Sequence, residues 1–276
     1  MHQFTDELNT FSQGELNKAL SRTQRAFECK NPMYLNYPPA WGILQIRRVI
    51  MEKTLHHDHQ TDMAGFSYLH LLGDLLRRWQ HHPLISLLSK ASIVEFHHTI
   101  ALLVTASYLT DAGNAIGFTN TPKENSASAD LYININATER IQLEIKTPKE
   151  LQWPHKTPHP DKLEDFLNKL IKKAKKQINS KLGGIIVIGA SAFGRKQMHA
   201  LDQAIKNLIR KGMISNSFLG IARIYTDLQP DFGDTSIEPV TARVYSRIEL
   251  HTNQRYAGGV NIRTTPKPSK GKPSRS

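Results

Sequence analysis

The sequence lacks several features that would assign it to a common protein class. Cys29 is the single cysteine among 276 residues, which excludes an internal disulfide and any metal cage built from cysteine alone. The longest apolar run, residues 99–109, is too short to span a bilayer. The first ten residues show no basic segment followed by an apolar core, which argues against a signal peptide. We therefore expect a cytoplasmic protein with no membrane partner.

Acidic residues are also scarce relative to basic ones. There are 24 Asp and Glu against 36 Lys and Arg, for a formal net charge of +12. Residues 162–181 carry seven lysines and two acids, and residues 263–276 carry five basic residues and no acid. Such an excess favours a polyanionic partner, because neutralised phosphates release condensed counterions. The chain has neither a P-loop nor a dinucleotide-binding fingerprint.

Residues 1–82 form a predicted helical region. Four leucines, Leu69, Leu72, Leu75 and Leu76, recur at helical spacing, and Pro83 marks the end of the region. We expect this region to recognise DNA, to dimerise or to bind a partner.

Residues 83–250 alternate between helical and strand patterns. Residues 84–110 predict one long helix broken near Ser89, and residues 111–129 predict a loop. Then follow a hairpin with strands near 131–135 and 141–145, a basic helix over 162–180, a buried strand over 184–189, a helix over 194–211, and strands over 218–225 and 240–250. This order predicts an α/β fold with a mixed central β-sheet flanked by helices. Residues 251–276 predict a basic, disordered tail.

The hairpin contains two acids and a lysine in a restricted arrangement. Alternation along a strand places Glu144 and Lys146 on one face and turns Ile145 toward the core. If the hairpin is centred on Ala137, Asp130 lies opposite Glu144, with β-carbons roughly 4.5–5.5 Å apart. Two carboxylates at that separation repel each other unless a cation lies between them, and Mg²⁺ is a cation that prefers such oxygen ligands. The alternative is a solvated cross-strand pair.

The pattern Ala129-Asp130 … Glu144-Ile145-Lys146 resembles that of the PD-(D/E)XK nuclease superfamily, with alanine where the motif name has proline. The resemblance covers about residues 84–250 and implies a restriction-endonuclease-like core. It implies that Asp130, Glu144 and the Ile145 carbonyl hold Mg²⁺, for which Mn²⁺ can substitute, and that Lys146 assists the attacking water. The implied activity is metal-dependent endonucleolytic hydrolysis of DNA, in a restriction or phage-defence setting.

The resemblance suggests roles for further residues. Glu95, a lone acid in an apolar stretch, matches a glutamate that the superfamily often places near the metal; otherwise it is an exposed helix residue. Gln177 matches a glutamine that some branches use to contact the substrate or the lysine; otherwise it is a plain surface residue. Four lysines flank the expected cleft and are candidate phosphate contacts or a solvated helix face: Lys172, Lys173, Lys175 and Lys176.

Two alternatives remain open. One is a catalytically inactive nuclease-fold subunit that binds nucleic acid or serves in an assembly. The other rests on the run His56-His57-Asp58-His59 with His70 and Asp74, which is similar to the metal site of HD-type phosphohydrolases. With one nuclease site per chain, cutting both DNA strands favours a homodimer or a partner subunit.

Overall fold

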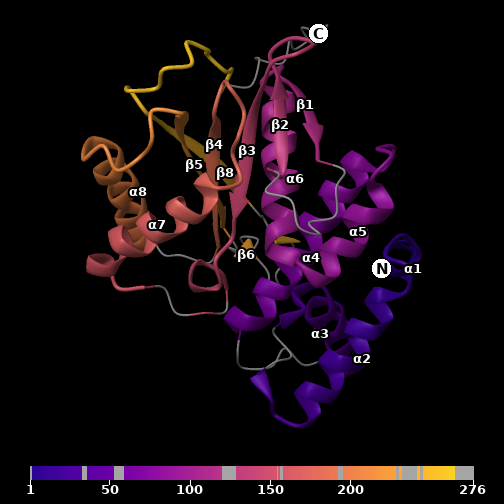
Figure 1. Ribbon diagram of the computed structural model, residues 1–276. Helices are drawn as coiled ribbons and strands as arrows, with labels where there is room; N and C mark the ends of the chain where they lie inside the picture. The colour runs from indigo at the N-terminus through magenta and orange to yellow at the C-terminus, as the bar shows by residue number, and fades with distance from the viewer. Residues whose placement is uncertain are drawn as a thin grey trace, which may run out of the picture.

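The computed structural model describes residues 2–32, 36–52, 59–119, 129–153, 155, 158–191, 195–227, 230–231, 241–242 and 245–264. The helices are α1 (His2–Phe11), α2 (Glu15–Glu28), α3 (Pro38–Glu52), α4 (His59–Trp79), α5 (Ile85–Val94), α6 (Phe96–Asp111), α7 (Pro160–Lys175) and α8 (Arg195–Arg210), as Figure 1 shows. The main strands are β1 (Ala115–Phe118), β2 (Leu131–Asn134), β3 (Arg140–Lys146), β4 (Gly184–Ser191), β5 (Phe218–Asp227) and β8 (Tyr245–Thr252). Two-residue strands β6 (Pro230–Asp231) and β7 (Thr241–Ala242) pair separately.

The main sheet has the order β1-β2-β3-β4-β5-β8. Strands β3, β4 and β5 are parallel, whereas the β1–β2, β2–β3 and β5–β8 pairs are antiparallel. All eight residues of β4 are buried, as expected for a continuous apolar strand with a helix layer on each face. The predicted α/β class with a mixed sheet is therefore confirmed.

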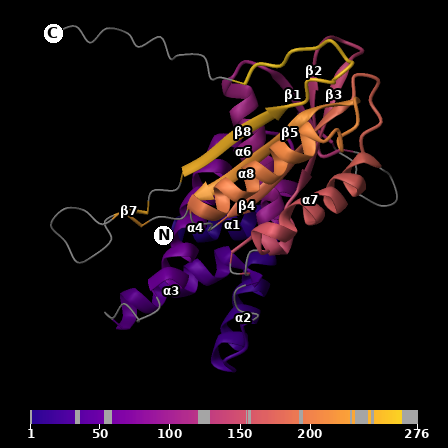
Figure 2. The same ribbon diagram turned by 90° about the vertical axis from the view of Figure 1, so that its left-hand side faces the viewer.

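Helices cover both faces of this sheet (Figures 1 and 2). On one face, α6 packs on inward side chains that include Leu143, Ile145 and Val187. On the other face, α7 and α8 enclose a second apolar cluster with Ile186 and Ile188. Because strand side chains alternate, Glu144 and Lys146 share the α7 face with Ile186. The sheet therefore presents the hairpin acid and lysine to the helix that follows them in sequence.

The N-terminal helices extend the core on the α6 face. Leu16, Leu72 and Ile100 belong to one continuous apolar cluster, which also contains sheet residues. Trp79 Nε1 donates a hydrogen bond to Ser107 Oγ at 3.0 Å, which joins α4 to α6. The predicted boundary after residue 82 therefore does not separate two hydrophobic cores. In the described residues, no helix combines the length and apolar character needed to cross a membrane.

Three predicted elements differ in the structure. The long helix breaks at Glu95, whose φ of −121° and ψ of 52° are not helical, and not near Ser89, which is buried inside α5. The predicted loop over 111–129 contains β1, which exists because it pairs with β2. Helix α7 ends at Lys175, before the predicted residue 180, because Gln142 Oε1 accepts hydrogen bonds from the backbone N–H groups of Asn179 and Ser180.

The C-terminal segment is ordered further than the sequence predicts. Strand β8 continues to Thr252, and Tyr256, Val260 and Ile262 pack against the main core. Tyr256 Oη donates to the Leu182 carbonyl at 2.7 Å. The expected disorder of 251–264 is therefore wrong, because apolar side chains within this polar-looking stretch bury themselves. The remaining predicted tail, 265–276, lies outside the described residues.

Candidate functional site

The β2–β3 hairpin has the register expected from the sequence. Leu131 pairs with Leu143 and Tyr132 with Gln142, so that the strands are symmetric about Ala137. The ladder begins at Leu131, and Asp130 lies just before it. The Asp130 backbone N–H donates to the Leu143 carbonyl at 3.0 Å, and Asp130 Oδ2 accepts the Ile145 N–H at 2.8 Å. The Asp130 carboxylate thus accepts the hydrogen bond that a backbone carbonyl of a paired strand would accept. This bond holds the carboxylate at Ile145, between Glu144 and Lys146 in the sequence of β3.

Glu144 and Lys146 form a buried ion pair on the α7 face. The Glu144 side chain has 0% of its surface exposed, and Lys146 Nζ donates to its Oε1. Lys146 Nζ also donates to Gln177 Oε1 at 2.6 Å. A buried carboxylate is tolerated when a cation compensates its charge, and Lys146 provides that cation. The structure therefore brings together three predicted site residues: Glu144, Lys146 and Gln177.

A histidine on α6, on the opposite face of the sheet from α7, contacts Asp130 just before the start of β2. His98, in the first turn of α6, places Nε2 at 3.3 Å from Asp130 Oδ1. The Asp130 side chain is 5% exposed and that of His98 is 22% exposed. Two helix layers thus contribute to the end of the hairpin, with His98 at Asp130 and Gln177 at Lys146. Ile145 lies between these contacts, with its N–H on Asp130 and its side chain in the α6-facing core.

Of the two settings predicted for Glu95, the structure has the exposed one. It is exposed at the break between α5 and α6, and the described residues offer its side chain no hydrogen bond or ion pair. The structure therefore agrees with the predicted alternative of an exposed residue, and the described residues give no support to a role near the metal. His98 lies three residues later, and its contact with Asp130 is the interaction that α6 contributes instead. The available signal in the sequence was the adjacent pair His97-His98, which lies in the first turn of α6.

The four predicted lysines flank this site. Lys172, Lys173, Lys175 and Lys176 are all exposed, whereas Ile171 and Ala174 between them are buried in the second cluster. The chain passes directly from this basic segment to Gln177, which contacts Lys146. The exposed lysines at the end of α7 therefore directly precede, in the sequence, the residue that contacts the ion pair.

A second polar cluster lies between α8, β5 and β8. Arg223 is buried and pairs with Asp202 (Nη2 to Oδ2, 3.1 Å) and Glu249 (Nη2 to Oε2, 2.8 Å), and His251 Nε2 lies 3.2 Å from Asp202 Oδ1. Ligand atoms of Asp202, Glu249 and His251 lie within 4.8 Å of one another, as in many metal sites. Burial raises the pKa of the Asp202 carboxyl, but hydrogen bonds from His251 and Arg223 outweigh burial and hold that pKa below its ordinary value.

We interpret this second cluster as an ion-pair network, because the Arg223 guanidinium already compensates both carboxylates. This network was not predicted from the sequence. A lone arginine inside the otherwise apolar pattern of 218–225 was the available signal, since such a charge requires partners.

The described residues give little support to the alternative of an HD-type metal site. His56, His57 and Asp58 lie outside them. His70 Nδ1 lies 3.3 Å from Asp74 Oδ2 on α4, and both side chains are more than half exposed. The pair is separated by four residues on one helix face, an arrangement typical of solvated helix pairs.

Comparisons with known proteins return no match among family models, curated proteins or solved structures. The function must therefore be inferred from the geometry of the hairpin site and from the charge around it.

Proposed function

We propose that the protein is a Mg²⁺-dependent endonuclease of the PD-(D/E)XK type that hydrolyses phosphodiester bonds in DNA. The observation that supports this proposal best is the pair of contacts on β3. Asp130 accepts a hydrogen bond from the Ile145 N–H. The neighbouring Glu144 and Lys146 form an ion pair, and Lys146 also donates a hydrogen bond to Gln177. These groups come from three separate parts of the chain, and a solvated strand face would not require their burial.

The donor set suits Mg²⁺. Asp130, Glu144 and the Ile145 carbonyl would hold the ion, because carboxylate and carbonyl oxygens are the ligands that Mg²⁺ prefers, and Mn²⁺ would accept the same ligands. The local charge also favours a cation, since Lys146 offsets one of the two buried acids and His98 carries charge only when it is protonated. When bound, the ion would supply Lewis-acid stabilisation of charge on the phosphate.

The protein groups have separate roles in this proposal. Lys146 Nζ, held by Glu144 and Gln177, orients the attacking water and stabilises negative charge that develops on the phosphate oxygens. His98 and the Ile145 N–H orient the Asp130 carboxylate. The exposed lysines at the end of α7 bind the phosphate backbone and hold the strand without reading its sequence.

The wider proposal covers the cellular setting. We propose a restriction or phage-defence role in the cytoplasm, by analogy with the superfamily. The N-terminal helices would recognise DNA, dimerise or bind a partner. Because each chain has one such site, double-strand cleavage would require a homodimer or a partner subunit.

The direct test is plasmid cleavage in Mg²⁺ by Lys146→Ala and Asp130→Asn proteins. We expect each substitution to reduce the cleavage rate at least about 100-fold, because electrostatic groups at the reacting phosphate contribute at that scale. Lys169→Ala is the matched control, since Lys169 is an exposed lysine on α7, and it should cleave at the normal rate. Thermal melting checks that each variant is folded, and DNA affinity is measured in EDTA.

A second candidate function is favoured by the Glu144–Lys146 ion pair, which already compensates the buried acid without metal. It is a nuclease-fold subunit that binds nucleic acid or serves in an assembly but does not cut. This candidate predicts that neither Mg²⁺ nor the substitution Glu144→Gln changes the affinity for DNA. It also predicts that the unaltered protein does not nick a plasmid. Undiminished cleavage by both site variants would contradict the nuclease site itself, and a parallel RNA substrate identifies the nucleic acid.

A further inference from the structure

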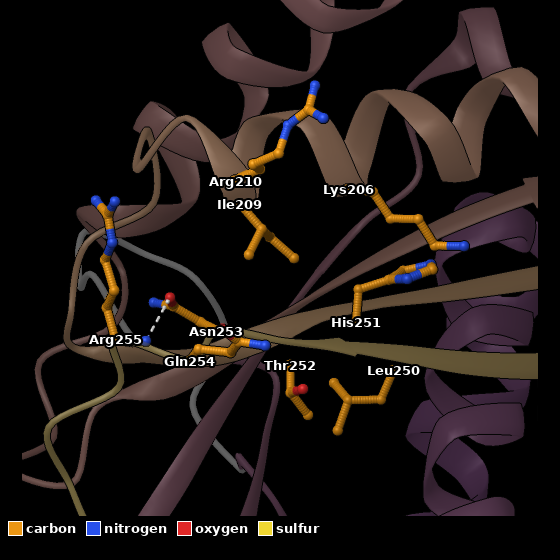
Figure 3. Close-up of a pocket in the computed structure, with 9 residues that line it drawn as sticks. All are labelled: Lys206, Ile209, Arg210, Leu250, His251, Thr252, Asn253, Gln254 and Arg255. Carbon is orange, nitrogen blue, oxygen red and sulfur yellow. Dashed lines mark hydrogen bonds between the residues drawn. The ribbon is translucent and has the colours of Figure 1, made fainter.

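A separate cavity lies between the C-terminal half of α8 and the end of β8 (Figure 3). Its volume is about 520 Å³, within the size range of small-ligand sites. The residues that line it are Lys206, Ile209, Arg210, Leu250, His251, Thr252, Asn253, Gln254 and Arg255. Three of them are permanent cations and none of these nine is acidic. The composition therefore favours an anionic ligand.

Buried polar groups hold the walls of this cavity in place. Asn253 is 4% exposed, and its Nδ2 donates to the carbonyls of Ser215 and Phe218 at 3.2 and 3.1 Å. Its Oδ1 accepts the backbone N–H of Arg255 at 3.1 Å, the bond drawn in Figure 3. The turn that carries Gln254 and Arg255 is thus fixed from beneath by a buried side chain.

Among the described residues, none of the three cations of the cavity forms a direct ion pair with an acidic side chain, although Arg210 lies close enough to Glu164 to help lower the pKa of that carboxyl. Within the described part of the chain, Lys206 and Arg255 form no ion pair, and the only side-chain bond of Arg210 goes to the neutral Asn207. Nearby cations differ: Lys211 pairs with Glu164, and Arg223 pairs with two acids. In Figure 3, Lys206 extends from α8 toward His251. Three cations thus line one cavity, and a bound anion would offset their charge.

We propose that this cavity binds the phosphate group of a nucleotide, either free or within a nucleic-acid strand. Lys206 and the guanidinium of Arg255 supply the charge, with Arg210 at the rim, and guanidinium groups match the geometry of phosphate oxygens. Ile209 and Leu250 provide apolar surface for the remainder of the nucleotide. Because none of the nine lining residues offers a carboxylate to a metal, the binding does not require Mg²⁺.

The cavity is distinct from the hairpin site. Glu144 aligns with Ile186, Ile186 with Ile221, and Ile221 with His251 across adjacent strands. Glu144 and His251 are therefore on one sheet face but three strand spacings apart, roughly 14 Å between their backbones. Helices α7 and α8 pack their apolar cluster over the strands between them. The inference thus stands independently of the proposed nuclease activity.

The test is calorimetric titration of the full chain in EDTA with thymidine 5′-monophosphate, with thymidine, and with a short 5′-phosphorylated oligonucleotide. We expect the phosphorylated probes to bind and thymidine not to bind. The variant Lys206→Gln/Arg210→Gln/Arg255→Gln should weaken binding at least tenfold. The control Arg22→Gln/Arg25→Gln/Lys90→Gln removes three exposed cations from α2 and α5 and should bind the mononucleotide normally.

The separate titrations distinguish a free nucleotide from a nucleic-acid strand as the source of the phosphate. Binding of the mononucleotide identifies a free nucleotide as a sufficient ligand, whereas binding of the oligonucleotide alone, lost in the cavity variant, identifies a strand phosphate. Single Lys206→Gln, which removes one charge and no described hydrogen bond, should weaken binding at least threefold if the triple variant does not fold. Lys146→Ala should bind thymidine 5′-monophosphate normally, so that the outcome at the cavity and the outcome at the nuclease site are distinguishable. Binding of neither phosphorylated probe, or binding unchanged in the cavity variants, would overturn the inference.

Discussion

Single residues at the hairpin site are positioned by partners from both helix layers. Asp130 receives the Ile145 N–H and the His98 ring, whereas Lys146 holds Glu144 and Gln177. Such buried polar groups are stable only when each has hydrogen-bond and charge partners. A residue that contacts a candidate ligand of the metal should therefore affect activity, even when it does not itself touch the substrate.

His98 and Glu95 provide a matched comparison on one helix turn. We expect His98→Ala to reduce Mg²⁺-dependent cleavage roughly tenfold, because loss of a group that orients a metal-binding carboxylate costs about 10- to 100-fold. Glu95→Gln should leave the cleavage rate unchanged, because Glu95 is exposed. The measurement is the cleavage rate across a Mg²⁺ titration. Equal effects of both substitutions would contradict the assignment of His98 to the site.

His97, the neighbour of His98, should make the protein less stable in acid. Its ring packs against Tyr68 and Phe96, and burial, aided by repulsion from His155, lowers its pKa to about 4. The ordinary histidine pKa is about 6.5 in the unfolded chain, so the neutral form favours folding. This stabilisation is complete above about pH 6.5 and is lost as the pH falls toward 4, a change of roughly 3 kcal/mol.

The check is denaturant unfolding at pH 7 and pH 4.5 for the natural protein and for His97→Gln. The variant should lose less unfolding free energy between the two pH values, because glutamine does not titrate. Other titrating groups affect both proteins equally. An identical loss in both would show that His97 does not carry this dependence.

Secondary-structure elements differ in how far local sequence determines them. The strand β4 follows from eight consecutive residues that tolerate burial on both faces, and the sequence predicted it. The strand β1 did not follow from its four residues, because its pairing with β2 and the packing of Tyr132 over Gly117 decide it. The break at Glu95 is likewise a tertiary feature, since neither proline nor glycine marks it.

The turn before β4 depends on a glycine. Gly183 has a φ of +69°, and a β-carbon there would lie 1.6 Å from the Ser217 carbonyl oxygen. Gly14 has a similar φ of +82° but open space around it. We expect Gly14→Ala to reduce the unfolding free energy by roughly 1 kcal/mol from backbone strain alone. Gly183→Ala should cost about 3 kcal/mol or more, because the steric clash adds to the strain.

Chemical denaturation of the two glycine variants measures this difference. Gly183→Ala should also loosen the Gln142 contacts with Asn179 and Ser180 that end α7, and so displace Gln177. Equal destabilisation by the two substitutions would mean that the backbone near Ser217 moves at little cost.

The whole molecule carries its excess charge unevenly. The hairpin site pairs the buried acid Glu144 with Lys146, whereas the end of α7 and the α8–β8 cavity display exposed cations. In the proposed function, sequence-independent attraction to DNA would therefore arise from these surfaces and not from the buried groups. Binding and cleavage should consequently respond to different substitutions.

Salt dependence measures the α7 surface. Replacing Lys172, Lys173, Lys175 and Lys176 by glutamine should reduce the slope of log affinity against log salt by up to about 4, because each lost phosphate contact contributes about 1. The measurement is DNA affinity in EDTA between 50 and 200 mM salt, a range over which such contacts differ strongly. A comparison variant replaces four exposed cations on α2 and α5, namely Lys18, Arg22, Arg25 and Lys90, and its slope separates the contribution of the N-terminal helices from that of α7. An unchanged slope in the α7 variant would remove these lysines from the interface.

The sequence by itself determined the α/β class, the hairpin register about Ala137 and the common face of Glu144 and Lys146. Each depends on a local period or on neighbours along the chain, and local periods are visible in sequence. Only the tertiary structure decided that His98 contacts Asp130, that Glu95 is exposed, and that residues 253–264 pack on the core. It also decided that Arg223, Asp202 and Glu249 share one network. These contacts join segments far apart in the chain, and their formation depends on how the helix layers pack on the sheet, which no local pattern encodes.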